Sequence, residues 1–124
     1  MSGARADGPS ELGAWLTPML SAFARGDRHE AARALLDVAA PRLAARLGDE
    51  DHLAHVLSNP AWAPLVGHGS ADVGPEERIG DAARLRIEVR TERGDRAAYL
   101  ASARQDVGGA WRLTGLVREE LASG

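Results

Sequence analysis

The chain has 124 residues, of which 44% are hydrophobic and 27% are charged, a composition typical of one globular domain. Its net charge of −3 at pH 7 offers no positive field to nucleic acid or to an anionic membrane. It contains no cysteine, which excludes disulfides, thiolate nucleophiles and cysteine-ligated metals. No apolar stretch approaches the ~20 residues of a membrane span. We therefore expect a cytoplasmic protein with no nucleic-acid or membrane partner.

The first half of the chain carries apolar residues at helical spacing. Ser10 is a suitable N-cap for a first helix over about residues 10–25. Pro18 lies inside this range and predicts a kink, or a later helix start with Pro18 in the first turn. The preceding residues 1–9 are expected to form a polar tail.

Two further helices are predicted. Asp27 is expected to cap a second helix over Arg28–Leu47, which Pro41 breaks or bends. Asp49 is expected to cap a short third helix over about residues 50–58.

The hydrophobic pattern changes at the connector Asn59–Leu65, whose two prolines are incompatible with a helix or a central strand. Beyond it, apolar and polar residues alternate, as they do in strands. Four strands are expected: Leu65–Val73, Ile79–Thr91, Arg96–Gln105 and Ala110–Glu119. Together these elements predict an α+β domain over residues 10–120, with three N-terminal helices packed on a curved four-stranded antiparallel sheet and a short tail at 121–124.

The strand pattern also predicts which residues face the helices. If a two-residue turn joins the second and third strands, the parity of the faces is kept. The inner face then contains Leu85, Ile87, Val89, Ala98, Leu100, Ser102, Trp111, Leu113, Gly115 and Val117. The outer face then contains Arg84, Arg86, Glu88, Arg90, Tyr99, Ala101, Thr114 and Leu116. A bulge in the hairpin would reverse the parity and turn Tyr99 inward.

Two short segments, together with this order of elements, resemble the nuclear transport factor 2-like superfamily, also called cystatin-like cone proteins. One is Phe23-Ala24-Arg25-Gly26-Asp27 at the end of the first helix. The other is the closing strand Gly108-Gly109-Ala110-Trp111-Arg112-Leu113-Thr114-Gly115-Leu116-Val117. The resemblance implies a cone-like fold with a pocket between helices and sheet, and a homodimer formed through the outer face of the sheet.

The superfamily includes ketosteroid isomerase-like and polyketide cyclase-like enzymes, epoxide hydrolases and dehydratases, as well as members that only bind or assemble. Fold alone does not choose among them. The isomerase-like members use an acid as base and a Tyr with a protonated acid as oxyanion donor. The first helix here has no inward Tyr, and the expected inner face has no carboxylate pair.

His68 and Asp81 are the candidate catalytic residues. His68 lies between two glycines, and a histidine at a pocket mouth is suited to proton transfer. Asp81 shares the parity of the inner face at the start of the second strand. The alternatives are a water-exposed histidine on an edge strand and a polar strand end.

The expected pocket lies behind the connector, with Trp15, Leu20, Trp62 and Ser102 as its wall. His52 and His55 stand at i, i+3 on one helix, but no third ligand with defined spacing accompanies them, so we expect no metal. No phosphate-binding or dinucleotide motif occurs, and we expect no cofactor.

The sequence therefore leaves three functions open. The first is the binding of a small apolar molecule by a homodimer without chemistry of its own. The second is a cofactor-free cyclase, dehydratase or isomerase in which His68 and Asp81 transfer the proton. The third is an assembly module that acts through the outer sheet face.

Overall fold

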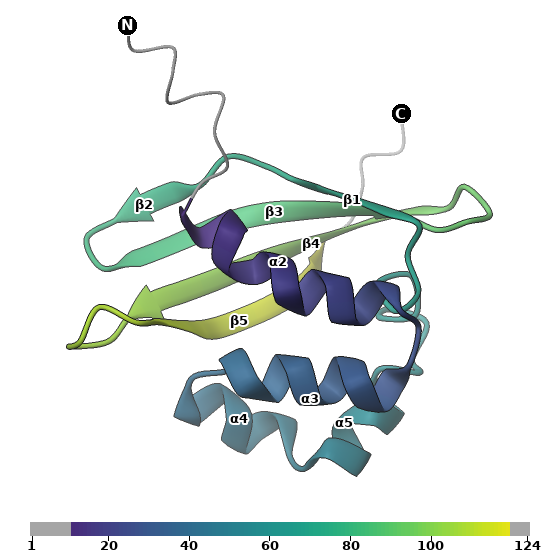
Figure 1. The fold of residues 1–124 in the computed structure, drawn as a ribbon, viewed down its shortest axis with the longest axis horizontal. Coiled ribbons are helices and arrows are strands. Elements are labelled where there is room, and N and C mark those ends of the chain that lie inside the picture. The colour runs from purple at the N-terminus through teal and green to yellow at the C-terminus, as the bar shows by residue number, and fades with distance from the viewer. Residues whose placement is uncertain (1–10, 120–124) are drawn as a thin grey trace, which may run out of the picture.

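The computed structural model describes residues 11–119, so the expected tails and the Ser10 cap lie outside the described residues. Within this range the helices precede the strands, which confirms the α+β class (Figure 1). The helices are α2 (Glu11–Ala24), α3 (Arg28–Val38), α4 (Pro41–Leu47) and α5 (Glu50–Val56). The strands are β1 (Ser70–Val73), β2 (Glu77–Ile79), β3 (Ala82–Arg90), β4 (Arg96–Gln105) and β5 (Trp111–Glu119).

One more helix is present than the sequence predicts, because Pro41 begins a new helix instead of bending the second one. Ala39 and Ala40 have extended backbone conformations, with ψ values of 139° and 155°, so α3 has already ended. Proline is well suited to the first position of a helix, where no intrahelical N–H bond is lost. The expected caps are confirmed: Asp27 accepts from two backbone N–H groups of α3, and Asp49 accepts from His52 N in α5.

One more strand is present as well. The expected second strand is interrupted by a tight turn at Gly80 and Asp81, with Ile79 opposite Ala82, and Gly80 takes a φ of 61° that suits glycine. The expected first strand is shorter than predicted, because only Ser70–Val73 pairs with β3.

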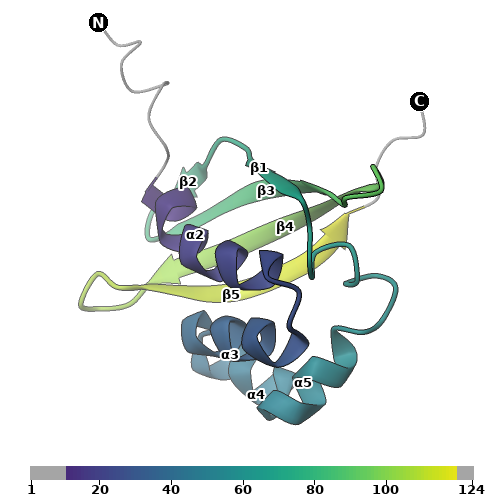
Figure 2. The same cartoon turned by 45° about the vertical axis from the view of Figure 1, so that its right-hand side comes forward.

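The sheet is antiparallel and runs β1-β3-β4-β5, and β2 also pairs with β3. It is an open sheet that is neither closed nor strongly curled (Figures 1 and 2). The α2 helix lies against β1 and β3, whereas α3 and α4 lie against β5, and α5 packs on α3. All the described helices therefore lie on one side of the sheet or at its β5 edge, and within residues 11–119 no helix covers the other face.

The expected register of β4 is wrong. Five residues, Thr91–Asp95, connect Arg90 to its partner Arg96, and this odd number reverses the parity that a two-residue turn would keep. Ile87 consequently pairs with Tyr99, which is fully buried. The inward residues of β4 are Ala97, Tyr99, Ala101 and Ala103, whereas Ala98, Leu100 and Ser102 face outward.

A second irregularity changes the faces of β5. Ala103 pairs with Leu113 but Ser102 pairs with Gly115, so Thr114 is an extra residue that forms a β-bulge. Trp111 and Leu113 face inward as predicted. After the bulge Leu116 faces inward, although it was predicted on the outer face. Val117 was predicted on the inner face, but it lies on the outer face and is 54% exposed.

Candidate functional site

His68 lies just before β1, in a turn and not in the exposed strand that the sequence suggested. It is buried, with 7% of its surface exposed, and its Nδ1 donates to the carbonyl of Leu65 at 2.7 Å. The preceding Gly67 has a φ of 79° and donates its N–H to Phe23 O at 2.7 Å. The Gly67 N–H therefore ties this segment to the end of α2, while His68 bonds back to the last residue of the connector.

Asp81 lies at the other end of the molecule. Its side chain is 61% exposed and is 3.4 Å from Arg104. Asp81 directly precedes β3, whereas Gly69, which follows His68, bonds to the last residue of that nine-residue strand. At about 3.3 Å per residue the two sites are roughly 25 Å apart. The structure does not bring His68 and Asp81 together.

The connector is fixed to the sheet at Ala61. The carbonyl of Ala61 accepts from the Tyr99 hydroxyl at 2.7 Å and from Arg118 Nη1 at 2.9 Å. The next residue, Trp62, stacks on the Tyr99 ring with 5.4 Å between centroids and 19° between planes. Burial raises the pKa of Tyr99 above its ordinary value, and the nearby Arg118 opposes this shift.

An apolar cavity of about 60 Å³ lies next to Trp62, between the helices and β5. All eight residues that line it are hydrophobic: Leu35, Leu43, Leu47, Leu53, Val56, Leu57, Trp62 and Leu116. The volume exceeds the 10–15 Å³ that one water needs, but the lining offers no polar side chain except the indole N–H of Trp62. The cavity is suited to an apolar group.

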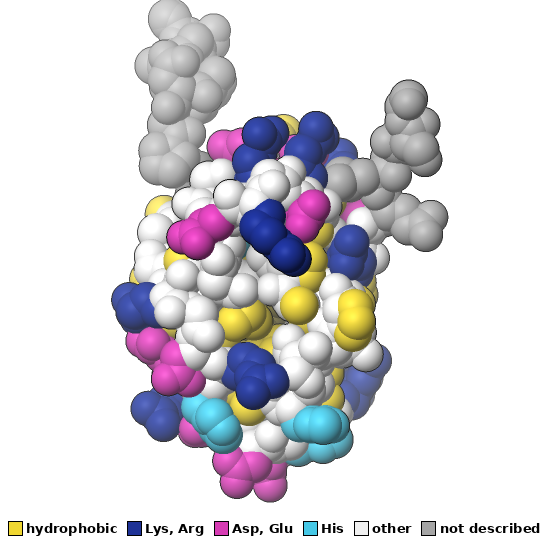
Figure 3. Space-filling model, turned by 90° about the vertical axis from the view of Figure 1, so that its right-hand side faces the viewer, with side chains coloured by type: hydrophobic (Ala, Val, Ile, Leu, Met, Phe, Trp, Pro, Cys, Tyr) yellow, Lys and Arg dark blue, Asp and Glu magenta, His cyan; other side chains and the backbone are white. Residues whose placement is uncertain are grey.

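The cavity is closed loosely on the side of α4. Leu43 and Leu47 on α4, with Val56 and Trp62, are partly exposed, and no residue of α4 is buried. The helix is flanked by Pro41 at its start and by Gly48, with a φ of 80°, at its end. Figure 3 shows hydrophobic side chains gathered in the middle of the face at the connector end of the molecule, with arginine and histidine side chains around them.

Only one of the four expected wall residues lines this cavity, namely Trp62. Leu20 is buried in the core and Trp15 packs partly against it, while Ser102 faces outward. The leucines of α4 and α5 were recognisable in the sequence as inward-facing. Their spacing alone did not show that they leave a space unfilled.

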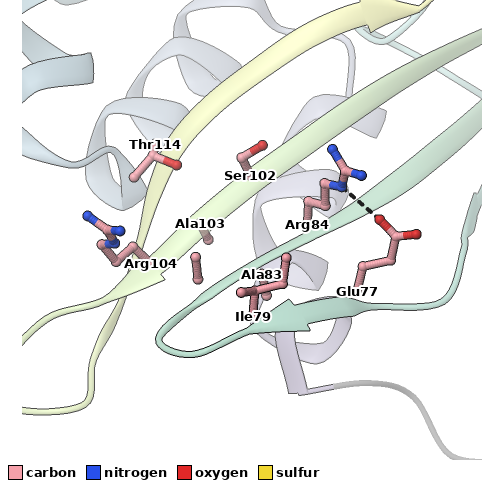
Figure 4. A pocket seen from close by; sticks show the side chains of 9 residues that line it. Glu77, Ile79, Ala83, Arg84, Ser102, Ala103, Arg104 and Thr114 are labelled. Carbon is pink, nitrogen blue, oxygen red and sulfur yellow. Dashed lines mark hydrogen bonds and ion pairs between the residues drawn. The ribbon is translucent and has the colours of Figure 1, made fainter.

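A second, wider hollow of about 390 Å³ lies on the uncovered face of the sheet. Figure 4 shows the side chains of Arg84, Ser102 and Thr114 on the side of the strands away from the helices. Its polar groups include the hydroxyls of Ser102 and Thr114, and Arg84 Nε, which is 2.7 Å from Glu77. Ile79 at its edge is 83% exposed.

Among residues 11–119 no three His, Cys, Asp or Glu side chains are grouped so that they could hold a metal ion, and this includes the surroundings of His52 and His55. None of the helices in the described part of the chain has the length and hydropathy needed to cross a bilayer.

Comparison with known proteins identifies no relative: the chain matches no protein-family model and no curated protein sequence.

Proposed function

We propose that this protein is a cytoplasmic, nuclear transport factor 2-like binding protein that holds a small apolar molecule, or the apolar part of a larger one, in the cavity beneath α4. The observation that carries this proposal is the wholly hydrophobic lining of that cavity. Ligand sites are typically apolar recesses with few polar groups. The enzyme alternative has no support from the candidate pair, because His68 and Asp81 lie at opposite ends of β3 and do not share a site.

The cavity must widen to take a ligand of ordinary size. Its volume of about 60 Å³ is well below the ~300 Å³ at the lower end of usual ligand pockets. Outward movement of α4 is the least costly way to widen it, because no residue of this helix is buried. Full burial of an eight-carbon chain would contribute about 6 kcal/mol, before the cost of association and of moving α4.

The test is a titration with 1-octanol, followed by methyl NMR of the leucines. We expect saturable shifts at Leu47 and Leu57, which line the cavity, and none at Leu85, which lies in the core away from it. The variant Leu47→Phe should fill the space and weaken binding at least tenfold. The control Leu36→Phe makes the same change at a partly buried position that does not line the cavity. Absence of saturable binding to the wild type would refute the proposal.

A second candidate function is self-association through the uncovered sheet face. Leu100 and Val117 pair in its middle, beside the small residues Ala98 and Gly115. The surrounding ion pairs, among them Arg86 with Glu119 at 3.2 Å, provide charges of both signs. Such a face is complementary to a second copy of itself, which a surface of one sign is not.

Light scattering tests this candidate. The wild type should have twice the 13.1 kDa mass of the chain at micromolar concentration, and Val117→Asp should be monomeric. The control Val107→Asp places the same charge in the fully exposed turn between β4 and β5 and should stay dimeric. A monomeric wild type would exclude the candidate without affecting ligand binding.

A further inference from the structure

A cationic side chain stands beside the exposed wall of the apolar cavity. Leu116, which lines the cavity, and Arg118 are two residues apart on β5 and so lie on the same face, roughly 7 Å apart along the strand. The guanidinium of Arg118 bonds to Ala61 O, and Ala61 precedes Trp62, which also lines the cavity. The cation is therefore fixed on the side of Trp62, one of the partly exposed residues of the lining.

Within residues 11–119, Arg118 has N–H donors that no carboxylate occupies. Several described arginines form ion pairs, for example Arg33 with Glu50 at 3.2 Å and Arg84 with Glu77 at 2.7 Å. No carboxylate within residues 11–119 lies within 4 Å of Arg118. Nη1 donates to the neutral carbonyl of Ala61, and the guanidinium also lies beside the Tyr99 side chain, with its carbon 5.8 Å from the ring centre. A guanidinium has five N–H donors, so among the described residues several of them remain for a ligand.

The position of Arg118 is also well defined for an exposed residue. The hydrogen bond to Ala61 and the contact with Tyr99 restrict its side chain, and Tyr99 is itself held by the same carbonyl and by Trp62. A side chain whose rotamer is already restricted loses less conformational entropy when a ligand binds. Stacking on an aromatic ring is a common arrangement for arginines that recognise anions.

On this basis we infer that the ligand is an anionic amphiphile: a short acyl chain that enters the apolar cavity and a carboxylate that pairs with Arg118. This inference rests on the proposed function and adds the chemistry of the head group to it. A carboxylate matches the planar donor fork of a guanidinium, and such charge-assisted bonds are about twice as strong as neutral ones.

The experiment compares three probes that have the same chain and different head groups: octanoate, 1-octanol and octylammonium. Calorimetric titrations at pH 7 and low salt should show that the wild type binds octanoate at least tenfold more tightly than 1-octanol and octylammonium least tightly. Raising the salt concentration should reduce the preference for octanoate, because Arg118 is exposed and its field is screened.

Two variants assign the preference to Arg118. Arg118→Gln should bring the affinities for octanoate and 1-octanol to within about twofold of each other. Arg93→Gln removes an exposed arginine from the turn between β3 and β4 and should leave the preference intact. Equal binding of octanoate and 1-octanol by the wild type would overturn the inference while leaving the proposed function in place. If none of the three probes binds, both are wrong.

Discussion

Among the described helices, α2 and α4 differ most in the share of their residues that is buried. Seven of the fourteen residues of α2 are buried, including Leu12, Leu16 and Phe23 at 0% exposure. None of the seven residues of α4 is buried, although Leu43 and Leu47 point toward the sheet side. The contrast indicates that α2 is a fixed part of the core, whereas α4 covers the cavity with little packing energy and is the helix that a ligand can displace.

The largest expected effect comes from making the same leucine-to-alanine substitution in each helix. Leu16→Ala in α2 should lower the free energy of unfolding by about 2–5 kcal/mol, because it opens a void in a filled core. Leu43→Ala in α4 should cost about 1 kcal/mol, since the side chain is already partly exposed and borders a cavity. Urea denaturation measures both. Equal costs would mean that α4 is as firmly packed as α2.

The connector belongs to the fixed part of the molecule. His68→Ala removes a buried donor and leaves the Leu65 carbonyl without its 2.7 Å partner, which should cost about 1–3 kcal/mol. Octanol binding by the folded variant should change little, because His68 does not line the cavity. Thermal denaturation and the same titration separate these effects. A stable variant that loses binding would assign His68 to the site instead.

A smaller effect is expected at Tyr99. Tyr99→Phe removes one of the two hydrogen bonds to Ala61 O and should cost about 1 kcal/mol at neutral pH, because Arg118 still donates to that carbonyl. The pKa of Tyr99 is raised in the folded state. The stability that its neutral form contributes is therefore complete below pH ~10 and is lost as the pH rises through the folded-state pKa. Denaturation at pH 9 to 11.5 should show this loss in the wild type, and Tyr99→Phe should lack that contribution.

The smallest expected effect is a difference in the free energy of local opening between the helices, which amide hydrogen exchange measures. Amides of α4 should exchange through openings that cost much less than global unfolding, whereas the central amides of α2 and β3 should approach the global limit. Saturating 1-octanol should slow exchange in α4 selectively. Uniform protection of both helices without ligand would contradict the role of α4 as a movable cover.

The sequence predicted the faces of β3 but not those of β4, and the residues explain why. In Leu85-Arg86-Ile87-Glu88-Val89 only one parity is apolar, so the buried face is unambiguous. In Arg96–Gln105 both faces suit burial. One face contains Ala97, Tyr99, Ala101 and Ala103, and the other contains Ala98, Leu100 and Ser102. The choice then depended on the length of the hairpin loop, which residue types do not fix.

The site shows a similar limit. The inward pattern of Leu43, Leu47 and Leu53 is readable from helical spacing, and so is the plug-like position of Trp62 in the connector. What spacing does not reveal is whether the side chains that meet from α4, α5 and β5 fill the volume between them. The pairing of His68 with Asp81 failed for another reason: β1 pairs antiparallel with the end of β3, so His68 lies at that end, while Asp81 lies at the start of the strand.

One hydrogen bond at the start of α2 bears on the order in which this chain folds. Leu12 N donates to Glu76 Oε1 at 2.9 Å, across 64 residues. The segment between β1 and β2 therefore caps a helix that lies far before it in the chain. The helix α3 is the main packing partner of α2, and β3 and β1 cover a smaller part of it. The helices α2 and α3 can therefore pack together early, whereas the cap of α2 forms only when a residue far along the chain has folded back to it, and such non-local contacts form late in folding.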